Sequence, residues 1–234
     1  MLSKRNIKPS LCLIVWNELE GCHNDVPLLP MHLFHEVYAI DGGSSDGTVD
    51  YLQSHAIQVY KQPKPSLNAA YNYAVEKCTG DSLVIFFPKG TIDPNCASTM
   101  IKHLENGYDL VIASRNISGG RNEEDNYLIK PRKWGVEFLS LTASLLWRRE
   151  GTRIHDVLHG VKAFTIEAYR QMNIAEMGIT IDLEMVIRAY RLNIPRIECP
   201  VTETRRLHGE TMFKILPTAK RLALFLWAEL FRSV

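Results

Sequence analysis

The segment AIDGGSSDGT, residues 39–48, joins the end of an apolar run to a turn and to the start of a helical pattern. The apolar run predicts a strand that ends at Ile40. The turn after it is rich in glycine, serine and aspartate, and a helix is expected to begin near Thr48. In open parallel sheets, ligands bind outside the carboxyl ends of the strands. The segment therefore predicts a strand, a ligand-binding turn and a helix in that order.

Two aspartates in this turn have different expected roles. A carboxylate repels phosphate, so Asp41 is expected to accept hydrogen bonds from a base or a ribose. The alternative is a purely structural turn in which Asp46 or Ser45 caps the following helix. Both interpretations can hold together, because Asp46 can cap the helix while Asp41 binds a ligand.

Apolar runs and helical patterns alternate on both sides of this segment. The runs are at residues 11–16, 36–40, 57–60, 82–87 and 109–114. Residues 48–55, 66–78 and 94–106 have apolar positions at helical spacing. Continuous apolar strands separated by helices are typical of a parallel sheet covered on both faces. The first half is therefore predicted to be a doubly wound α/β domain.

The second half begins with a polar, glycine-bearing stretch, residues 115–132, which is predicted to be a loop. Helices are expected at 133–147, 166–172 and 182–192, and strands at 160–165 and 196–201. We expect both halves to share one sheet. The predicted organisation is a single domain over residues 1–214, followed by a C-terminal apolar helix within 215–234.

The composition narrows the class of protein. The chain has 234 residues, of which 46% are hydrophobic and 23% are charged, as in ordinary globular proteins. Its net charge of +1 gives no electrostatic reason to expect a nucleic-acid partner. Five cysteines without a CxxC pair predict reduced thiols in a cytoplasmic protein.

The segment PTAKRLALFLWAELFRSV, residues 217–234, predicts a helix that begins at Pro217. Its apolar residues cover nearly all sides, with Lys220, Arg221 and Arg232 near the ends. One interpretation is a helix packed on the domain or on a second subunit. The other is an interfacial helix that holds the protein at the cytoplasmic face of a membrane.

Six segments, taken in order, resemble the inverting family 2 glycosyltransferases of the GT-A fold. They are IVWNELEG, AIDGGSSDGTVDYL, LNAAYNYAVEKCTGDSLVIFF, ASRN, HDVLHGVKAF and DLEMVIRAYRLNIPRIECPVTETRRLHGET. The last one is similar to the ending of the dolichyl-phosphate mannose synthase group. The resemblance covers about residues 10–214. It implies a GT-A-like (Rossmann-like), mostly parallel sheet flanked by helices, and transfer of a sugar from a UDP- or GDP-linked donor to a sugar or lipid-phosphate acceptor.

The resemblance also implies site residues. The substrate-binding candidates are Asn17, Glu18, Asp41, Ser44, Asp46, Arg115, Arg205 and Arg206. The arginines suit phosphate because a guanidinium group binds phosphate oxygens bidentately. Asp156 and Lys89 are the catalytic candidates, and Asp156 would act as a base only if the acceptor is a hydroxyl. The alternatives are a solvated turn at Asn17 and Glu18 and a purely structural Asp156.

The chain departs from the family at the expected metal site. Family members end the fourth strand with Asp-x-Asp, which holds Mg or Mn, whereas this chain has Phe87, Pro88 and Lys89 there. Lys89 could supply the positive charge itself and give a metal-independent transferase. It could instead be a solvated loop residue. A third interpretation is a catalytically silent, nucleotide-binding or membrane-peripheral partner protein. A nucleotidyltransferase would normally need a glycine-rich loop that IVWNELEG does not supply.

Overall fold

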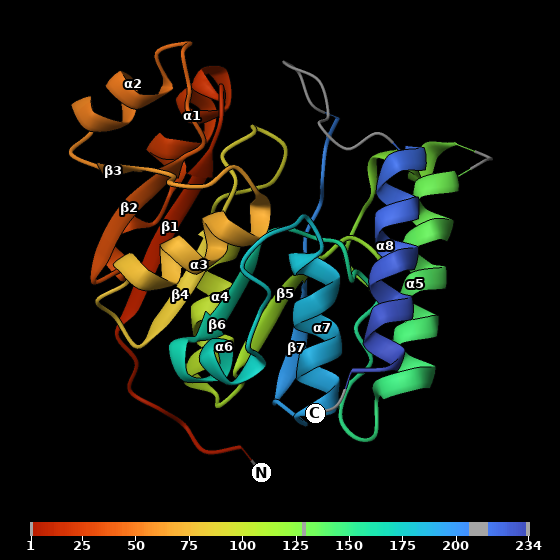
Figure 1. Cartoon of the computed structure of the whole chain (residues 1–234). Helices are drawn as coiled ribbons and strands as arrows, with labels where there is room; N and C mark the ends of the chain where they lie inside the picture. Colours follow the sequence, from red (N-terminus) through yellow and green to blue (C-terminus); the bar gives the residue numbers. More distant parts are fainter. Residues whose placement is uncertain (1, 128–129, 206–214, 233–234) are drawn as a thin grey trace.

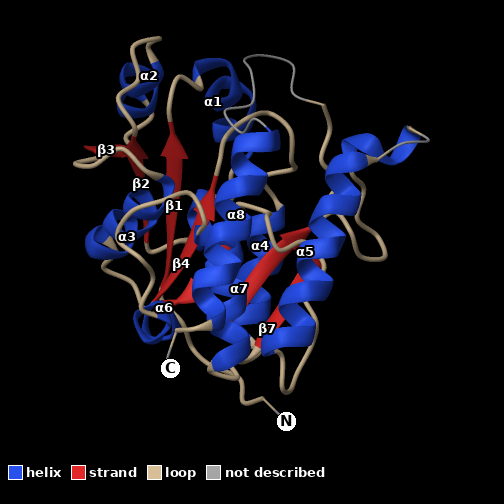
Figure 2. Cartoon of the chain, turned by 45° about the vertical axis from the view of Figure 1, so that its right-hand side comes forward, coloured by secondary structure: helices blue, strands red, loops and turns tan. Residues whose placement is uncertain are grey.

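A computed structural model of the chain describes residues 2–127, 130–205 and 215–232. Within them, helices cover both faces of one seven-stranded sheet (Figure 1 and Figure 2). The strands are β1 Pro9–Val15, β2 Glu36–Asp41, β3 Gln58–Lys61, β4 Ser82–Phe86, β5 Leu110–Ser114, β6 Lys162–Thr165 and β7 Arg196–Pro200. The single α/β domain and the sheet shared by both halves are therefore as predicted.

The strand order is β3-β2-β1-β4-β6-β5-β7. Only β6 runs antiparallel to its neighbours, β4 and β5. The carboxyl ends of the parallel strands consequently share one edge of the sheet with the beginning of β6. This edge brings together turns that are far apart in the sequence, and all the site candidates described below lie on or near it.

The helices are α1 Leu19–Asp25, α2 Thr48–Ser54, α3 Leu67–Lys77, α4 Cys96–Glu105, α5 Pro131–Trp147, α6 Ile166–Met172, α7 Ile181–Arg191 and α8 Ile215–Leu230. Short 3-10 turns lie at Val26–Leu28, Met31–Leu33 and Glu123–Asn126. Helix α1 was not predicted. It has only seven residues, and no side chain caps its beginning, so it lacks the usual sequence signals of a helix.

Both faces of the sheet are buried, which explains the continuous apolar strands. On β4, Leu83 and Ile85 belong to one core cluster, together with residues of α3, α5, α6, α7 and α8. Val84 and Phe86 belong to the other, with residues of α1, α2 and α4. Side chains alternate between the faces of a strand, so a strand covered on both sides must be apolar throughout.

Helix α8 packs against its own domain, as one of the two interpretations predicted. Leu222 is buried in the core, and the buried carboxylate of Glu229 lies 2.8 Å from Arg188 Nη2 of α7. Arg188 also lies 3.5 Å from Glu184 of its own helix. The opposite face of α8 stays open, with Trp227 65% exposed. In the described part of the chain, no helix is long and apolar enough to cross a membrane.

The ion pair between α7 and α8 gives a test of this packing. Replacing Glu229 by Ala leaves Arg188 with less compensating charge in a buried site, so we expect a loss of about 3 kcal/mol in the free energy of unfolding. Urea denaturation measures it. Glu176→Ala, which removes an exposed pair with Lys64, is the control and should leave the midpoint unchanged. Equal midpoints for both variants would mean that α8 does not depend on this pair.

Candidate active site

Hydrogen bonds join the turns that follow β1 and β2. The backbone N–H of Asn17 donates to Ser44 Oγ at 2.8 Å, and the N–H of Ser45 donates to Asn17 Oδ1 at 2.8 Å. Asn17 has a left-handed backbone with φ of 51°, a conformation that asparagine tolerates better than most residues. The Glu18 N–H donates to Thr48 Oγ1 at 3.0 Å. Asn17, Glu18 and Ser44 thus form one rigid edge.

Asp46 reinforces the same edge. Its carboxylate accepts the N–H groups of Leu19 at 3.1 Å and of Thr48 at 3.0 Å. Burial would raise the pKa of Asp46, but hydrogen bonds from Thr48 and Leu19 prevail and lower it. The N-cap position of α2 is Gly47, with φ of 96°, and not Asp46 or Ser45 as the sequence suggested. Asp46 therefore joins the turns after β1 and β2 from the position just before the N-cap residue of α2.

Asp41 lies at the carboxyl end of β2 and is almost fully buried. Its carboxylate accepts the N–H groups of Gly43 and Ser44, each at 3.0 Å. Trp16 is 48% exposed and lies against the residue after Asp41, since a Cβ on Gly42 would be 3.3 Å from Trp16 Cβ. The exposed Trp16 next to the turn after β2 was not predicted from the sequence. A tryptophan directly after a buried strand was the available signal.

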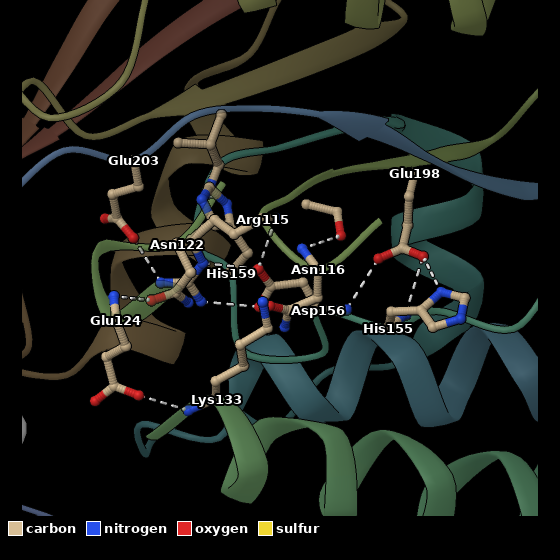
Figure 3. Close-up of polar contacts among 12 residues, drawn as sticks. Arg115, Asn116, Asn122, Glu124, Lys133, His155, Asp156, His159, Glu198 and Glu203 are labelled. Carbon is tan, nitrogen blue, oxygen red and sulfur yellow. Dashed lines mark hydrogen bonds and ion pairs between the residues drawn. The ribbon is translucent and has the colours of Figure 1, made fainter. Parts of the chain in front are cut away.

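Arg115 and Asp156 form a bidentate ion pair at the end of β5 (Figure 3). Arg115 Nε and Nη2 donate to the two Asp156 carboxylate oxygens at 2.7 and 2.8 Å. Arg115 Nη1 donates to Glu203 at 2.6 Å. Burial would lower the pKa of Arg115, but the two carboxylates prevail and raise it. One guanidinium is thus shared by two carboxylates, which leaves the cluster with a formal charge of −1.

Asp156 is fully buried beneath Arg115. Burial would raise its pKa, but Arg115 prevails and lowers it. Glu198 fixes the segment from the other side, because its carboxylate accepts the N–H groups of His155 and Asp156, each at 2.9 Å. Both carboxylate oxygens of Asp156 are thus engaged by Arg115.

A second buried ion pair, Lys162 with Asp182, lies where β6 begins. The Lys162 side chain is fully buried and donates to the His159 carbonyl and to the Asp182 carboxylate. Burial raises the pKa of Asp182, while the charges of Lys162 and Lys89 act in the opposite direction. Asp182 was not predicted as a site residue from the sequence. Its position at the start of the predicted 182–192 helix was the only signal.

Lys89 follows the end of β4, in the turn Phe87–Pro88–Lys89–Gly90. Its ammonium lies 5.0 Å from the centre of the Phe87 ring, and the side chain is partly buried. The Phe87 ring thus shields part of the Lys89 ammonium from solvent.

The segment after β7 crosses the site and brings Arg205 to this turn. The N–H of Thr204 donates to the Thr91 carbonyl at 2.9 Å, and Glu203 pairs with Ile92 as an antiparallel bridge. Arg205 follows directly and is exposed. Arg206, the equal candidate, lies outside the described residues.

The residues at the end of β4 do not fit a divalent cation. Phe87, Pro88 and Lys89 have no side-chain oxygen, and an ammonium repels a cation. Asp93 accepts the Asn95 N–H at 2.9 Å, and Asp81 lies at the opposite end of β4, where it accepts the Lys8 N–H at 2.8 Å. Over residues 2–127, 130–205 and 215–232, no group of three or more His, Cys, Asp or Glu side chains has a metal-binding arrangement.

With this geometry established, the chain can be placed among known proteins. Residues 10–173 match the family described as glycosyl transferase family 2. That match covers more than half of the chain, and the chain belongs to this family. The predicted family and the GT-A type of fold are thereby confirmed.

Three curated proteins are similar in sequence to this chain over most of its length. The chain is 27% identical to glycosyltransferase AglJ of Haloferax volcanii over 86% of this chain and 65% of that protein. It is 25% identical to polyprenol monophosphomannose synthase of Mycolicibacterium smegmatis, over 86% and 82%. It is 23% identical to dolichol-phosphate mannosyltransferase of Pyrococcus furiosus, over 89% and 60%. The chain thus spans less than two thirds of the first and third of these relatives.

Solved structures support the fold. Glucosyl-3-phosphoglycerate synthase from Mycobacterium tuberculosis, in complex with Mn²⁺, uridine diphosphate and glucosyl-3-phosphoglycerate, has a TM-score of 0.70. The match covers 98% of this chain and 82% of that one, at 16% identity. A second structure of the same synthase has a TM-score of 0.71, also at 16% identity. At this identity the likeness shows a common fold.

The buried His159 gives a pH-dependent prediction. Burial lowers the pKa of His159 from 6.5 to about 4, so the folded protein keeps the ring neutral where the unfolded chain takes up a proton. Stability should therefore fall by about 3 kcal/mol as the pH falls from 6.5 to about 4. His159→Gln should remove most of this slope in urea denaturation. The control, exposed His32→Gln, should retain it, and an unchanged slope in the His159 variant would contradict the buried neutral ring.

Proposed function

We propose that this chain is an inverting glycosyltransferase that uses a nucleotide-sugar donor and meets the diphosphate with Lys89 instead of a divalent metal. The observation that carries the proposal is the partly buried ammonium at the end of β4, on the edge shared with the turns after β1 and β2. Membership of the family and the named activities of its relatives support nucleotide-sugar transfer in general.

The nucleoside of the donor is proposed to bind over the β1 and β2 turns. Asp41 would accept from an N–H of the base, and the exposed Trp16 ring offers a flat surface for stacking. Asn17, Glu18, Ser44 and Asp46 would act mainly by holding this edge rigid, because their hydrogen bonds join the two turns. A rigid edge lowers the entropy lost when the donor binds.

The diphosphate requires positive charge as it leaves. Arg115 is already neutralised by Asp156 and Glu203, and Lys162 is neutralised by Asp182. Lys89 at the end of β4 and the exposed Arg205 in the segment after β7, with Arg206, are the proposed phosphate-binding cations. Arg115 could reach a phosphate only by exchanging Glu203 for it.

The acceptor decides whether a general base is needed. A phosphate acceptor is already anionic and can attack the anomeric carbon directly, whereas a hydroxyl must lose its proton. Asp156 has both oxygens engaged by Arg115 and a lowered pKa. Asp182 accepts from Lys162 through Oδ1, and burial raises its pKa, so it is the better proposed base for a hydroxyl acceptor.

Transfer measured with and without EDTA tests the proposal. With UDP- and GDP-linked sugars and either a polyprenyl phosphate or a hydroxyl acceptor, we expect turnover that survives EDTA. Lys89→Met should lower kcat by about 100-fold, because one charge that stabilises the leaving group is lost. Exposed Lys102→Met, on α4, is the matched control and should behave as wild type.

Three outcomes would decide against parts of this proposal. Turnover that is lost in EDTA and restored by Mn²⁺ would disprove the role of Lys89. Nucleotide binding weakened by Asp41→Ala, but without turnover under any condition, would favour the catalytically silent alternative. A failure to bind any UDP- or GDP-linked donor would contradict both the transferase and the silent nucleotide-binding alternative.

The apolar surface of α5 and α8 suggests where a lipid-linked acceptor would be found. Both helices lie on the same side of the molecule (Figure 1), and Arg191 of α7 contacts Trp147 of α5 and the Glu229 carbonyl of α8. Large apolar side chains are exposed on both helices and just after α8: Trp134, Phe138, Leu141, Leu145, Leu224, Trp227 and Phe231. We propose that this surface contacts a membrane peripherally.

Vesicle co-sedimentation tests the membrane contact. The double variant Phe138→Ser and Trp227→Ser should lower binding to lipid vesicles by about tenfold or more, because two exposed rings no longer enter the interface. Leu28→Ser, which removes an exposed leucine of a 3-10 turn, is the control. Equal binding of all three proteins, or none by the wild type, would contradict the proposed contact.

A further inference from the structure

The turn that carries Lys89 is held on both sides by side chains that the proposed reaction does not itself require. This turn consists of Phe87, Pro88, Lys89 and Gly90 and is called the FPKG turn below. One set of contacts fixes the Lys89 side chain, and another fixes the backbone.

Phe87 provides the contact to the side chain. Its ring centre lies 5.0 Å from Lys89 Nζ, within the range of a cation–π interaction. The ring itself is confined, because a Cβ on Gly160 would come within 2.8 Å of Phe87 Cε2. The ring of Tyr71 lies 6.5 Å away on the same side of the core. Phe87 is therefore a fixed surface for the ammonium.

Helix α1 provides the contacts to the backbone. The Gly90 N–H donates to Asp25 Oδ2 at 2.8 Å, and Asp25 is buried. A Cβ on Gly21 would come within 2.1 Å of the Pro88 carbonyl oxygen, so only glycine allows α1 to approach the turn this closely. Gly90 has φ of 68°, which also favours glycine.

We propose that Phe87 and Asp25 are positioning residues that hold the Lys89 ammonium at the diphosphate site as a fixed part of the fold. The inference rests on the proposed function and adds how the cation is held. A single ammonium brings one charge where a metal ion brings two, so its effect depends on being in place before the diphosphate arrives. A flexible lysine would lose side-chain entropy on binding, and the FPKG turn removes that cost.

The position of Lys89 can be measured without any activity. Lysines of the full chain are dimethylated with ¹³C-formaldehyde, and the Lys89 signal is assigned with Lys89→Arg. In the wild type we expect this signal to be shifted upfield by the Phe87 ring. Phe87→Leu should return it to the range of exposed lysines, and Phe87→Tyr should keep the shift. Asp25→Asn, which retains an acceptor for Gly90, should leave the signal in place, whereas Asp25→Ala should reduce the shift.

A second aromatic pair serves as a matched control. Lys77 Nζ lies 4.8 Å from the centre of the Tyr73 ring on α3, so Tyr73→Leu should move the Lys77 signal and leave that of Lys89 unchanged. The proposal is overturned if Lys89 is not shifted in the wild type. It is also overturned if Phe87→Leu, folded by circular dichroism, leaves its signal where it was.

Steady-state kinetics tests whether the position of the Lys89 ammonium affects turnover. Phe87→Leu should lower kcat by about tenfold, as expected from one lost cation–π contact, with the KM of the acceptor unchanged and with recovery in Phe87→Tyr. A loss of the shift without any change in kcat would overturn the functional part of the inference. Absence of turnover in every protein, with the shift intact, would instead count against the proposed function.

Discussion

Charge at the carboxyl edge of the sheet is the constraint on which the site depends. A leaving diphosphate needs compensating positive charge, and the end of β4 presents Phe87 and Lys89 in place of side-chain oxygens. The other basic groups near this edge are largely neutralised, because Arg115 binds two carboxylates and Lys162 binds Asp182. We propose that Lys89, at the end of β4, supplies positive charge to the diphosphate together with the exposed Arg205.

The buried ion pairs instead fix the backbone around the Lys89 ammonium. Asp156 and Glu203 come from segments that are far apart in the sequence, and their shared partner Arg115 joins them to the end of β5 (Figure 3). Breaking such pairs is costly, because a buried charge is then left without compensation. The pair of Arg188 with Glu229 holds α8 against α7 in the same way. Because Asp182 lies in the first turn of α7, this pair links the exposed apolar surface of α8 to the helix that carries Asp182.

The sequence was sufficient for the architecture because continuous apolar strands and helical periodicity are local signals. They predicted a mostly parallel sheet, and the family motifs predicted the edge occupied by Asn17, Asp41 and Arg115. Helix α1 was missed because it is short and has no capping side chain. The partners of Asp156 and the pairing of Lys162 with Asp182 were not predictable, because they depend on β6 running antiparallel and on the segment after β7 crossing back over the site.

The most direct test of the central claim is a crystal structure of the chain grown with Mn²⁺ and a nucleoside diphosphate, with anomalous data collected for manganese. We expect a phosphate oxygen within hydrogen-bonding distance of Lys89 Nζ, the Lys89 side chain still over Phe87, and no anomalous peak between the diphosphate and the protein. A manganese ion bound to the diphosphate and to a carboxylate of this chain, with Lys89 turned away, would contradict it.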